Sequence, residues 1–175
     1  NMTKVVNEQE PTPVDIREEI KSMFESRKPV SNPKLKGKAR GKNLIVIQVE
    51  ALQNFVLGLE VNGMEVTPNL NRLARENIYF SSYYSQIAQG NTSDAEFVTN
   101  NSFYPLSQGA AYFRCVNNTF ASLPALFREQ GYATVAMHAY KGSYWNRAVI
   151  YPRLGFDVFY SQKDFEQDEL IGWGL

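Results

Sequence analysis

The chain has 175 residues, of which 43% are hydrophobic and 13% are aromatic, and this composition is sufficient for the core of one globular domain. Its 18 basic and 18 acidic residues cancel, which excludes the long-range positive field of a nucleic-acid-binding protein, so binding is expected to be local. The single cysteine, Cys115, excludes an internal disulfide and a metal cluster of several cysteines.

Residues 1–42 are predicted to form a leader and a linker. One amphipathic helix is expected from about Val14 to Ser26, and a segment rich in Pro, Lys and Arg follows it. The basic residues of that segment are Lys34, Lys36, Lys38, Arg40 and Lys42. They could contact an anionic membrane surface, but a solvated linker is the preferred interpretation.

From residue 43 onward, strand and helix patterns alternate. The sequence NLIVIQV (43–49) is a continuous apolar and β-branched run, which predicts a strand buried on both faces. The run is far shorter than the roughly 18 to 20 residues that span a bilayer. Thr67 and Pro68 have the types preferred at the N-cap and first position of a helix, and IYFSSYY (78–84) predicts a second strand.

The second half of the chain continues this alternation. The sequence SDAEFVTNN predicts a helix, with Ser93 and Glu96 at capping-box spacing. A helix over SLPALFREQG should end at Gly131, and it is followed by the strand YATVAM, a short helix near RAVIYPRLG and the strand FDVFY. The pattern predicts an α/β fold with a mostly parallel sheet and helices on both faces, which binds ligands at the carboxyl ends of its strands.

Polar residues follow two of the predicted strands. Glu50 comes directly after the first strand, where it is either a solvated or capping residue or a ligand for a hard cation such as Mg²⁺ or Mn²⁺. His138, the only histidine, follows YATVAM and has either a structural or a functional role. Thr92, at a predicted helix start, either caps the helix or is a nucleophile at its positive end. The topology could bring all three residues together.

A loop with the sequence SYWNR holds two further candidates. Trp145 and Arg147 can be explained by packing and by a surface ion pair. Alternatively, Arg147 binds a phosphate or sulfate with its planar guanidinium while Trp145 packs against the rest of the ligand. The sequence leaves both interpretations open.

Residues 43–175 contain, in this order, the segments VEALQNF, EVTPNLNRLA, QGNTSDAEF, NNSFYPL, GAAYF, SLPALFREQGY, MHAYKGSYWNR and GWGL. On these segments the chain resembles the extracellular catalytic domain of the lipoteichoic acid synthase family. These enzymes are phosphoglycerol transferases of the sulfatase and alkaline phosphatase superfamily. It implies the fold of that superfamily, incomplete in this chain, because the family completes its metal site with an Asp-His pair downstream of GWGL.

The resemblance also implies a role for each candidate residue. Thr92 matches the nucleophile that takes glycerol phosphate from phosphatidylglycerol and passes it to a lipoteichoic-acid-type acceptor. Glu50 and Thr92 match ligands of Mn²⁺ or Mg²⁺, and His138, Trp145 and Arg147 match residues that contact glycerol phosphate.

Two positions depart from the family pattern. Asn91 stands where members often have Lys, and Tyr140 stands where they often have an acidic residue.

The resemblance further implies a fragment of a bacterial cell-membrane enzyme, with membrane helices before the basic linker and an extracellular catalytic domain. Its partners would be phosphatidylglycerol and a glycolipid or polymer acceptor, with no nucleic acid. The chain itself is expected to be inactive, to bind metal weakly and to self-associate through a free strand edge.

Two alternatives are left open, one within the same enzyme superfamily and one from another class of protein. The first is another phosphodiesterase of the superfamily, a phosphoethanolamine transferase or a sulfatase, although Cys115 lacks the Cys-x-Pro-x-Arg context of a sulfatase nucleophile. The second is a non-catalytic module that binds phosphate or glycolipid.

Overall fold

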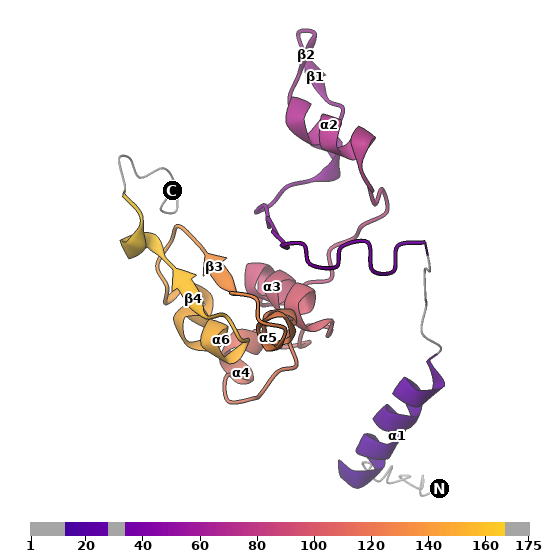
Figure 1. Cartoon of the computed structure of the whole chain (residues 1–175), viewed down its shortest axis with the longest axis vertical. Coiled ribbons are helices and arrows are strands. Elements are labelled where there is room, and N and C mark those ends of the chain that lie inside the picture. Colours follow the sequence, from indigo (N-terminus) through magenta and orange to yellow (C-terminus); the bar gives the residue numbers. More distant parts are fainter. Residues whose placement is uncertain (1–12, 28–33, 167–175) are drawn as a thin grey trace, which may run out of the picture. The chain divides into compact units, whose positions relative to one another are not determined.

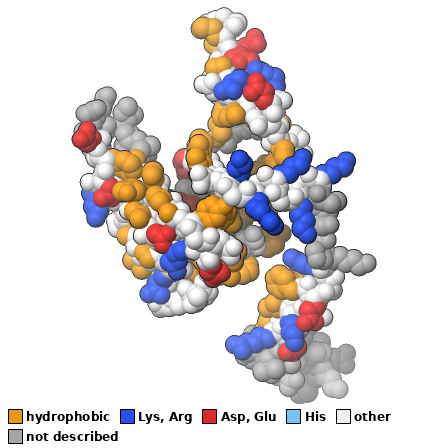
Figure 2. Space-filling view, in the orientation of Figure 1, with side chains coloured by type: hydrophobic (Ala, Val, Ile, Leu, Met, Phe, Trp, Pro, Cys, Tyr) orange, Lys and Arg blue, Asp and Glu red, His pale blue; other side chains and the backbone are white. Residues whose placement is uncertain are grey.

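The computed structural model describes residues 13–27 and 34–166, and the chain divides into two compact units, Asn1–Val46 and Ile47–Leu175. In the first unit, α1 (Pro13–Ser26) is the predicted leader helix. The exposed residues 34–41 form consecutive turns, along which Lys and Arg side chains gather (Figure 2). Within the described ranges, no helix has the length and apolar character needed to cross a membrane.

The second unit begins with a small hairpin and a helix. After a 3₁₀ turn (η1, Asn54–Val56), β1 (Glu60–Val61) pairs with β2 (Met64–Glu65) in antiparallel register. The linking residues Asn62 and Gly63 both have positive φ, 52° and 76°, which suits the tight turns of two-residue hairpins. The sequence analysis did not predict this hairpin.

The predicted helix after Thr67 is confirmed as α2 (Pro68–Glu76). Thr67 is the N-cap residue, but its hydroxyl donates to the carbonyl of Val56 at 2.9 Å instead of capping the helix. Thr67 therefore ties the start of α2 to the 3₁₀ turn before the hairpin.

The remaining elements are helices grouped with a pair of parallel strands (Figure 1). The helices are α3 (Asn91–Asn101), α4 (Ala111–Arg114), α5 (Leu123–Glu129) and α6 (Arg147–Arg153), and the strands are β3 (Val135–Met137) and β4 (Val158–Tyr160). Short 3₁₀ turns, η2 (Tyr144–Asn146) and η3 (Gln162–Asp164), precede α6 and follow β4. This arrangement confirms the predicted α/β class.

The two faces of the β3–β4 pair differ. Ala136 and Phe159 are register partners and pack against the buried core. On the other face, Met137 and its partner Tyr160 are 67% and 41% exposed. Apolar side chains are visible at the surface of this part of the molecule (Figure 2). In the described part of the chain, helices cover one face of this pair, whereas the sequence predicted helices on both.

The core is an aromatic and aliphatic cluster that joins α3, α4 and α6. Its buried members are Phe97, Ala111, Tyr112, Phe120, Ile150, Tyr151 and Leu154. The ring of Phe97 makes edge-to-face contacts with those of Tyr112 and Phe120, at centroid distances of 6.5 and 5.5 Å. This cluster fixes the helix that carries Thr92 against the rest of the unit.

Two predicted strands are wrong. Residues 43–49 and 78–84 have no strand pairing in the structure, and apolar members such as Ile45 and Ile47 are 82% and 81% exposed. Strand patterns in sequence report apolar and β-branched character, but a strand exists only where a neighbour accepts its backbone hydrogen bonds. No such neighbour is present among the described residues. The terminal GWGL lies outside them.

Gly155 follows the end of α6 and packs closely against Ala125 of α5. Its replacement by alanine should destabilise the fold strongly. Its φ is +91°, and an added Cβ would lie 2.6 Å from the Cα and 2.7 Å from the backbone nitrogen of Ala125. We expect Gly155→Ala to lower the free energy of unfolding by about 2 to 5 kcal/mol, because strain and backbone overlap add. Urea unfolding followed by circular dichroism measures this change.

Gly131 provides the matched control. Its φ is +82°, but an added Cβ would meet nothing within 4 Å. Gly131→Ala should therefore cost only the conformational strain, about 1 to 2 kcal/mol. Equal losses for the two variants would contradict the close packing of Gly155 on α5.

Candidate active site

Helix α3 begins at Asn91, directly after Gly90, and not at Ser93 as predicted. The predicted capping box is also wrong. The Ser93 hydroxyl donates to the carbonyl of Gly90 at 2.8 Å, and Asp94, not Glu96, accepts the backbone N–H of Gly90 at 2.9 Å. The physical reason is that Glu96 has a stronger partner elsewhere, a buried arginine.

The structure brings Thr92 and Glu50 into direct contact. The hydroxyl of Thr92 donates to Glu50 Oε2 at 2.8 Å, although the two residues are far apart in the sequence. Gln48 Nε2 also donates to the backbone carbonyl of Thr92 at 3.4 Å. A threonine hydroxyl at a helix N-terminus therefore faces a carboxylate that can accept its proton.

His138 follows β3 directly, and its backbone N–H donates to the carbonyl of Tyr160 at 2.9 Å. The backbone N–H of Tyr140 donates to His138 Nδ1 at 3.1 Å, so a neutral ring carries its proton on Nε2. Burial, and next the positive charge of Arg147, lowers the pKa of His138, while Glu96 and Glu50 oppose this shift. His138 is therefore a neutral hydrogen-bond donor at pH 7.

Arg147 is the most tightly held residue of the site. Its side chain is fully buried, and its Nη2 lies 2.6 Å from Glu96 Oε1, with Nε 3.0 Å from the same oxygen. Its Nη1 donates to the carbonyl of Tyr144 at 3.3 Å. The hydroxyl of Tyr151 donates to Glu96 Oε2 at 2.9 Å, and burial followed by the charge of Glu96 raises the pKa of Tyr151. Arg147 is thus in a buried ion pair and not the surface pair considered from the sequence.

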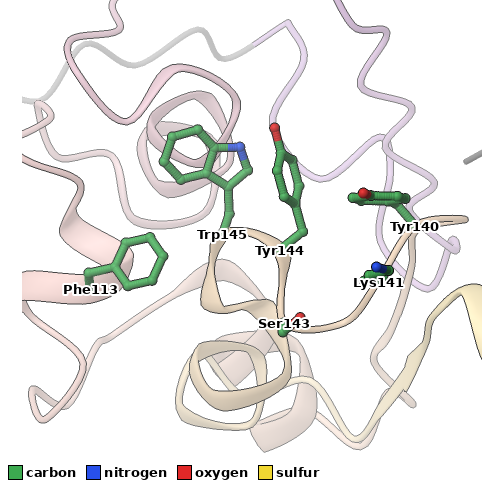
Figure 3. Close-up of a pocket in the computed structure, with 6 residues that line it drawn as sticks. All are labelled: Phe113, Tyr140, Lys141, Ser143, Tyr144 and Trp145. Carbon is green, nitrogen blue, oxygen red and sulfur yellow. The ribbon is translucent and has the colours of Figure 1, made fainter. Parts of the chain in front are cut away.

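A hollow of about 450 Å³ lies beside Trp145 (Figure 3). Its lining residues are Phe113, Tyr140, Lys141, Ser143, Tyr144 and Trp145. The rings of Tyr140 and Tyr144 meet edge to face at 5.1 Å. The buried Nε1 of Trp145 has no hydrogen-bond partner in the described part of the chain. The hollow thus combines aromatic side chains with a lysine, and one of these aromatic residues, Trp145, has a buried donor without a partner.

The loop that carries Trp145 has an unusual backbone. Trp145 and the next residue, Asn146, both have left-handed conformations, with φ of 54° and 58°. The side-chain amide of Asn146 donates to the carbonyl of Tyr112 at 2.8 Å, which ties this turn to the core. Such conformations persist only where surrounding contacts hold them, and they are frequent at functional sites.

The sequence missed Glu96 as the partner of Arg147. A signal was available, because Thr92 and Glu96 are four residues apart on one helix and therefore share a face. The structure joins Glu50 to Thr92, and Arg147 to Glu96 one turn further along α3. The roles of these residues in catalysis and binding stay predictions.

Glu50 and Thr92 are also the candidate ligands for a metal ion. The oxygens of Glu50 and Thr92 are the donor type that Mg²⁺ and Mn²⁺ prefer. Across the described ranges, no three His, Cys, Asp or Glu residues gather into a site. The pair therefore fits a hard cation as part of a ligand set.

Comparison with known proteins gives a consistent result. A family model described as sulfatase matches residues 42–174. The chain is 37% identical over 153 residues to lipoteichoic acid synthase 2 of Bacillus subtilis (strain 168), covering 86% of this chain and 24% of that protein. It is 40% identical over 150 residues to lipoteichoic acid synthase of Staphylococcus aureus (strain NCTC 8325 / PS 47), covering 82% and 23%. The chain thus spans about a quarter of the length of these curated relatives.

Solved structures agree with the sequence relatives. The crystal structure of the lipoteichoic acid synthase LtaP from Listeria monocytogenes superposes with a TM-score of 0.82 at 31% identity, over 89% of this chain and 38% of that one. A protein of the alkaline phosphatase superfamily from Vibrio parahaemolyticus has a TM-score of 0.54 at 22% identity, over 62% and 26% of the two chains. The second match supports the fold alone.

The buried pair of Arg147 and Glu96 should behave as one energetic unit. We expect Glu96→Ala to lower the free energy of unfolding by about 3 to 5 kcal/mol, because it leaves a buried charge without a partner. The double variant Glu96→Ala with Arg147→Met should lose much less than the sum of the two single losses. Urea unfolding of the four proteins measures this coupling.

Tyr151→Phe is the control for this cycle, since it removes one hydrogen bond to Glu96 and leaves the ion pair intact. It should cost about 1 kcal/mol. Additive losses for Glu96 and Arg147 would contradict the proposed coupling.

The titration of His138 can be measured directly, because the chain has one histidine. Its NMR titration midpoint in the folded protein should lie below 6.5, since burial and Arg147 lower its pKa. The folded state then binds fewer protons than the unfolded state, so stability should fall as pH drops below 6.5 toward the folded pKa. His138→Gln should remove this part of the pH dependence. A titration midpoint above 6.5 would contradict the lowered pKa of His138.

Proposed function

The chain belongs to the sulfatase family, and on this premise we propose that it forms part of a metal-dependent phosphoglycerol transferase whose nucleophile is Thr92. The observation that carries the proposal is the 2.8 Å hydrogen bond from the Thr92 hydroxyl to Glu50 at the start of α3. Support comes from the relatives named lipoteichoic acid synthase, which match most of this chain. The donor would be phosphatidylglycerol.

In the proposed reaction, Thr92 Oγ1 attacks the phosphorus of the donor in line. A bond forms between Oγ1 and phosphorus as the Thr92 hydroxyl loses its proton, the bond to the diacylglycerol oxygen breaks, and that oxygen takes up a proton in exchange. Glu50 accepts a hydrogen bond from the hydroxyl in the resting state, which orients the lone pairs of Thr92 for the attack. A hydroxyl of the acceptor then attacks the phosphoglyceryl group: the bond from the acceptor oxygen to phosphorus forms, the bond to Oγ1 breaks, and the proton that the acceptor loses is balanced by one that Oγ1 takes up.

Glu50 and Thr92 would hold a Mn²⁺ or Mg²⁺ ion. When bound, such a cation lowers the pKa of a coordinated hydroxyl and offsets phosphate charge. Two oxygens are fewer than either ion requires, and across the described ranges no third His, Cys, Asp or Glu side chain joins them. We therefore propose that the chain alone binds metal weakly and is inactive.

Three residues are proposed to hold the glycerol phosphate group. His138 would donate from Nε2 as a neutral imidazole, and Trp145 would donate from its unpaired Nε1. Arg147 would contribute its positive charge. Its Nε and Nη2 face Glu96, whereas Nη1 donates to the carbonyl of Tyr144 and is the nitrogen proposed to face phosphate. Such fixed donors need no reorganisation as negative charge develops on phosphate.

The remaining proposals concern the setting of the reaction. The acceptor would be a glycolipid or a growing lipoteichoic-acid-type polymer, and the site would lie outside the cell on a membrane-anchored protein. The exposed basic residues between 34 and 42 would lie near the anionic membrane surface.

The test uses a chimera in which this chain replaces the matching segment of the Bacillus subtilis lipoteichoic acid synthase 2. The chimera should release diacylglycerol from phosphatidylglycerol in the presence of Mn²⁺ and carry a phosphoglyceryl adduct on Thr92, seen by mass spectrometry. Thr92→Ala should reduce turnover at least about a thousandfold, because no other group forms the intermediate. Thr99→Ala, an exposed threonine on the same helix, is the matched control and should have near wild-type turnover.

Two outcomes would contradict the proposal. An adduct on another residue, or turnover that persists in Thr92→Ala, would remove Thr92 as the nucleophile. Glycerol phosphate binding without any turnover by the chimera would instead favour a non-catalytic module.

A further inference from the structure

Asp94 is a fully buried acidic residue that the proposed reaction does not use. Its Oδ2 accepts the backbone N–H of Ala88 at 3.0 Å and that of Gly90 at 2.9 Å. One carboxyl oxygen therefore holds two successive parts of the loop that leads into α3. Its other oxygen, Oδ1, is buried and has no partner in the described part of the chain.

Gly90 packs directly against this carboxyl group. Its φ of −81° and ψ of −4° are open to any residue, so the backbone conformation does not require glycine. However, an added Cβ would lie 2.1 Å from Asp94 Oδ1 and 2.5 Å from its Cγ. Glycine is required here because the side chain of Asp94 occupies the space of a Cβ.

The turn before Thr92 is held at both the N–H and the carbonyl of Gly90. The N–H of Gly90 donates to Asp94, and its carbonyl accepts from the backbone N–H of Ser93 at 2.9 Å and from the Ser93 hydroxyl at 2.8 Å. Asn91 then has a left-handed conformation, with φ of 43°, that surrounding contacts must maintain. The direction of the Thr92 side chain depends on this turn.

We infer that Asp94 is a positioning residue for Thr92: it holds the loop from Ala88 to Gly90 so that the Thr92 hydroxyl is aimed at Glu50 and the reacting phosphate. The inference rests on the proposed role of Thr92 as nucleophile. The side chain of Asp94 bonds the backbone of Ala88 and Gly90 and not the Thr92 side chain, so Asp94 acts through the backbone. A small displacement of a nucleophile costs rate more than binding, on the order of 10²-fold for about 1 Å.

Kinetics of the chimera test this role. Asp94→Ala should lower kcat about 100-fold and change KM less than about threefold. Asp94→Asn should recover most of that loss, because its amide oxygen can still accept both N–H groups. Asp164→Ala is the matched control, since Asp164 accepts the backbone N–H of Ser161 in a turn remote in sequence, and it should leave kcat unchanged.

A second pair of variants tests the same contact from the side of Gly90. Gly90→Ala should displace the Asp94 side chain and lower kcat as Asp94→Ala does. The double variant Gly90→Ala with Asp94→Ala should be no worse than Asp94→Ala, because the new methyl group enters the vacated space.

A measurement without substrate separates this inference from the proposed function. In the 175-residue chain, hydrogen exchange at the amides of Ala88 and Gly90 should be slow, fast in Asp94→Ala and slow again in Asp94→Asn. The NMR shifts of Thr92 should change and recover in parallel. If the chimera forms no adduct on Thr92 while these amides behave as expected, the proposed function fails and the role of Asp94 in this turn stands.

Three results would overturn the inference. The first is unchanged kcat in a folded Asp94→Ala variant. The second is an Asp94→Asn variant as impaired as Asp94→Ala although its amide protection is retained, which would make Asp94 a charged catalytic group. The third is additive loss in the double variant with Gly90→Ala. If Asp94→Ala does not fold, unchanged kcat in a folded Gly90→Ala variant whose Ala88 amide exchanges fast would overturn the inference instead.

Discussion

The buried ion pair between Arg147 and Glu96 is the interaction on which the candidate site depends. A charged guanidinium without exposure to water is costly unless a carboxylate and further hydrogen bonds compensate it. Glu96 accepts from Nε and Nη2, the carbonyl of Tyr144 accepts from Nη1, and Tyr151 completes the shell of Glu96. The pair therefore holds α3, the loop before α6 and α6 itself in one arrangement.

This arrangement gives α3 two functions along its length. Its first turn carries Thr92, and its next turn carries Glu96, so the proposed nucleophile and the anchor of Arg147 belong to one rigid element. The aromatic core fixes the same helix through Phe97. Asp94 lies between Thr92 and Glu96 on the helix and accepts two backbone N–H groups of the loop that leads into it. Positioning of the site is thus a property of the packed helix and its start, and not of a flexible loop.

The strand pair explains why the sheet was harder to predict than the helices. Parallel strands are normally covered on both faces, and their sequences are apolar throughout. In the described residues, β3 and β4 pack one face on the core and leave Met137 and Tyr160 exposed on the other. The apolar run at 43–49 has the composition of another such strand but has no ladder partner here. Composition alone does not indicate whether a partner is present.

The sequence by itself determined the elements whose signals are local. Helix α5 follows from the run SLPALFREQG and ends before the left-handed Gly131, and β3 and β4 follow from short apolar runs between turns. It also singled out Glu50, at the end of an apolar run that does not pair as a strand in the structure, and Thr92, at a helix start. Tertiary structure decided the rest: that Glu50 meets Thr92, that Glu96 pairs with Arg147, and that Asp94 caps the turn in place of the predicted box. The physical reason is that caps and periodicity act within a few residues, whereas a buried charge takes whichever partner the packed chain brings within reach.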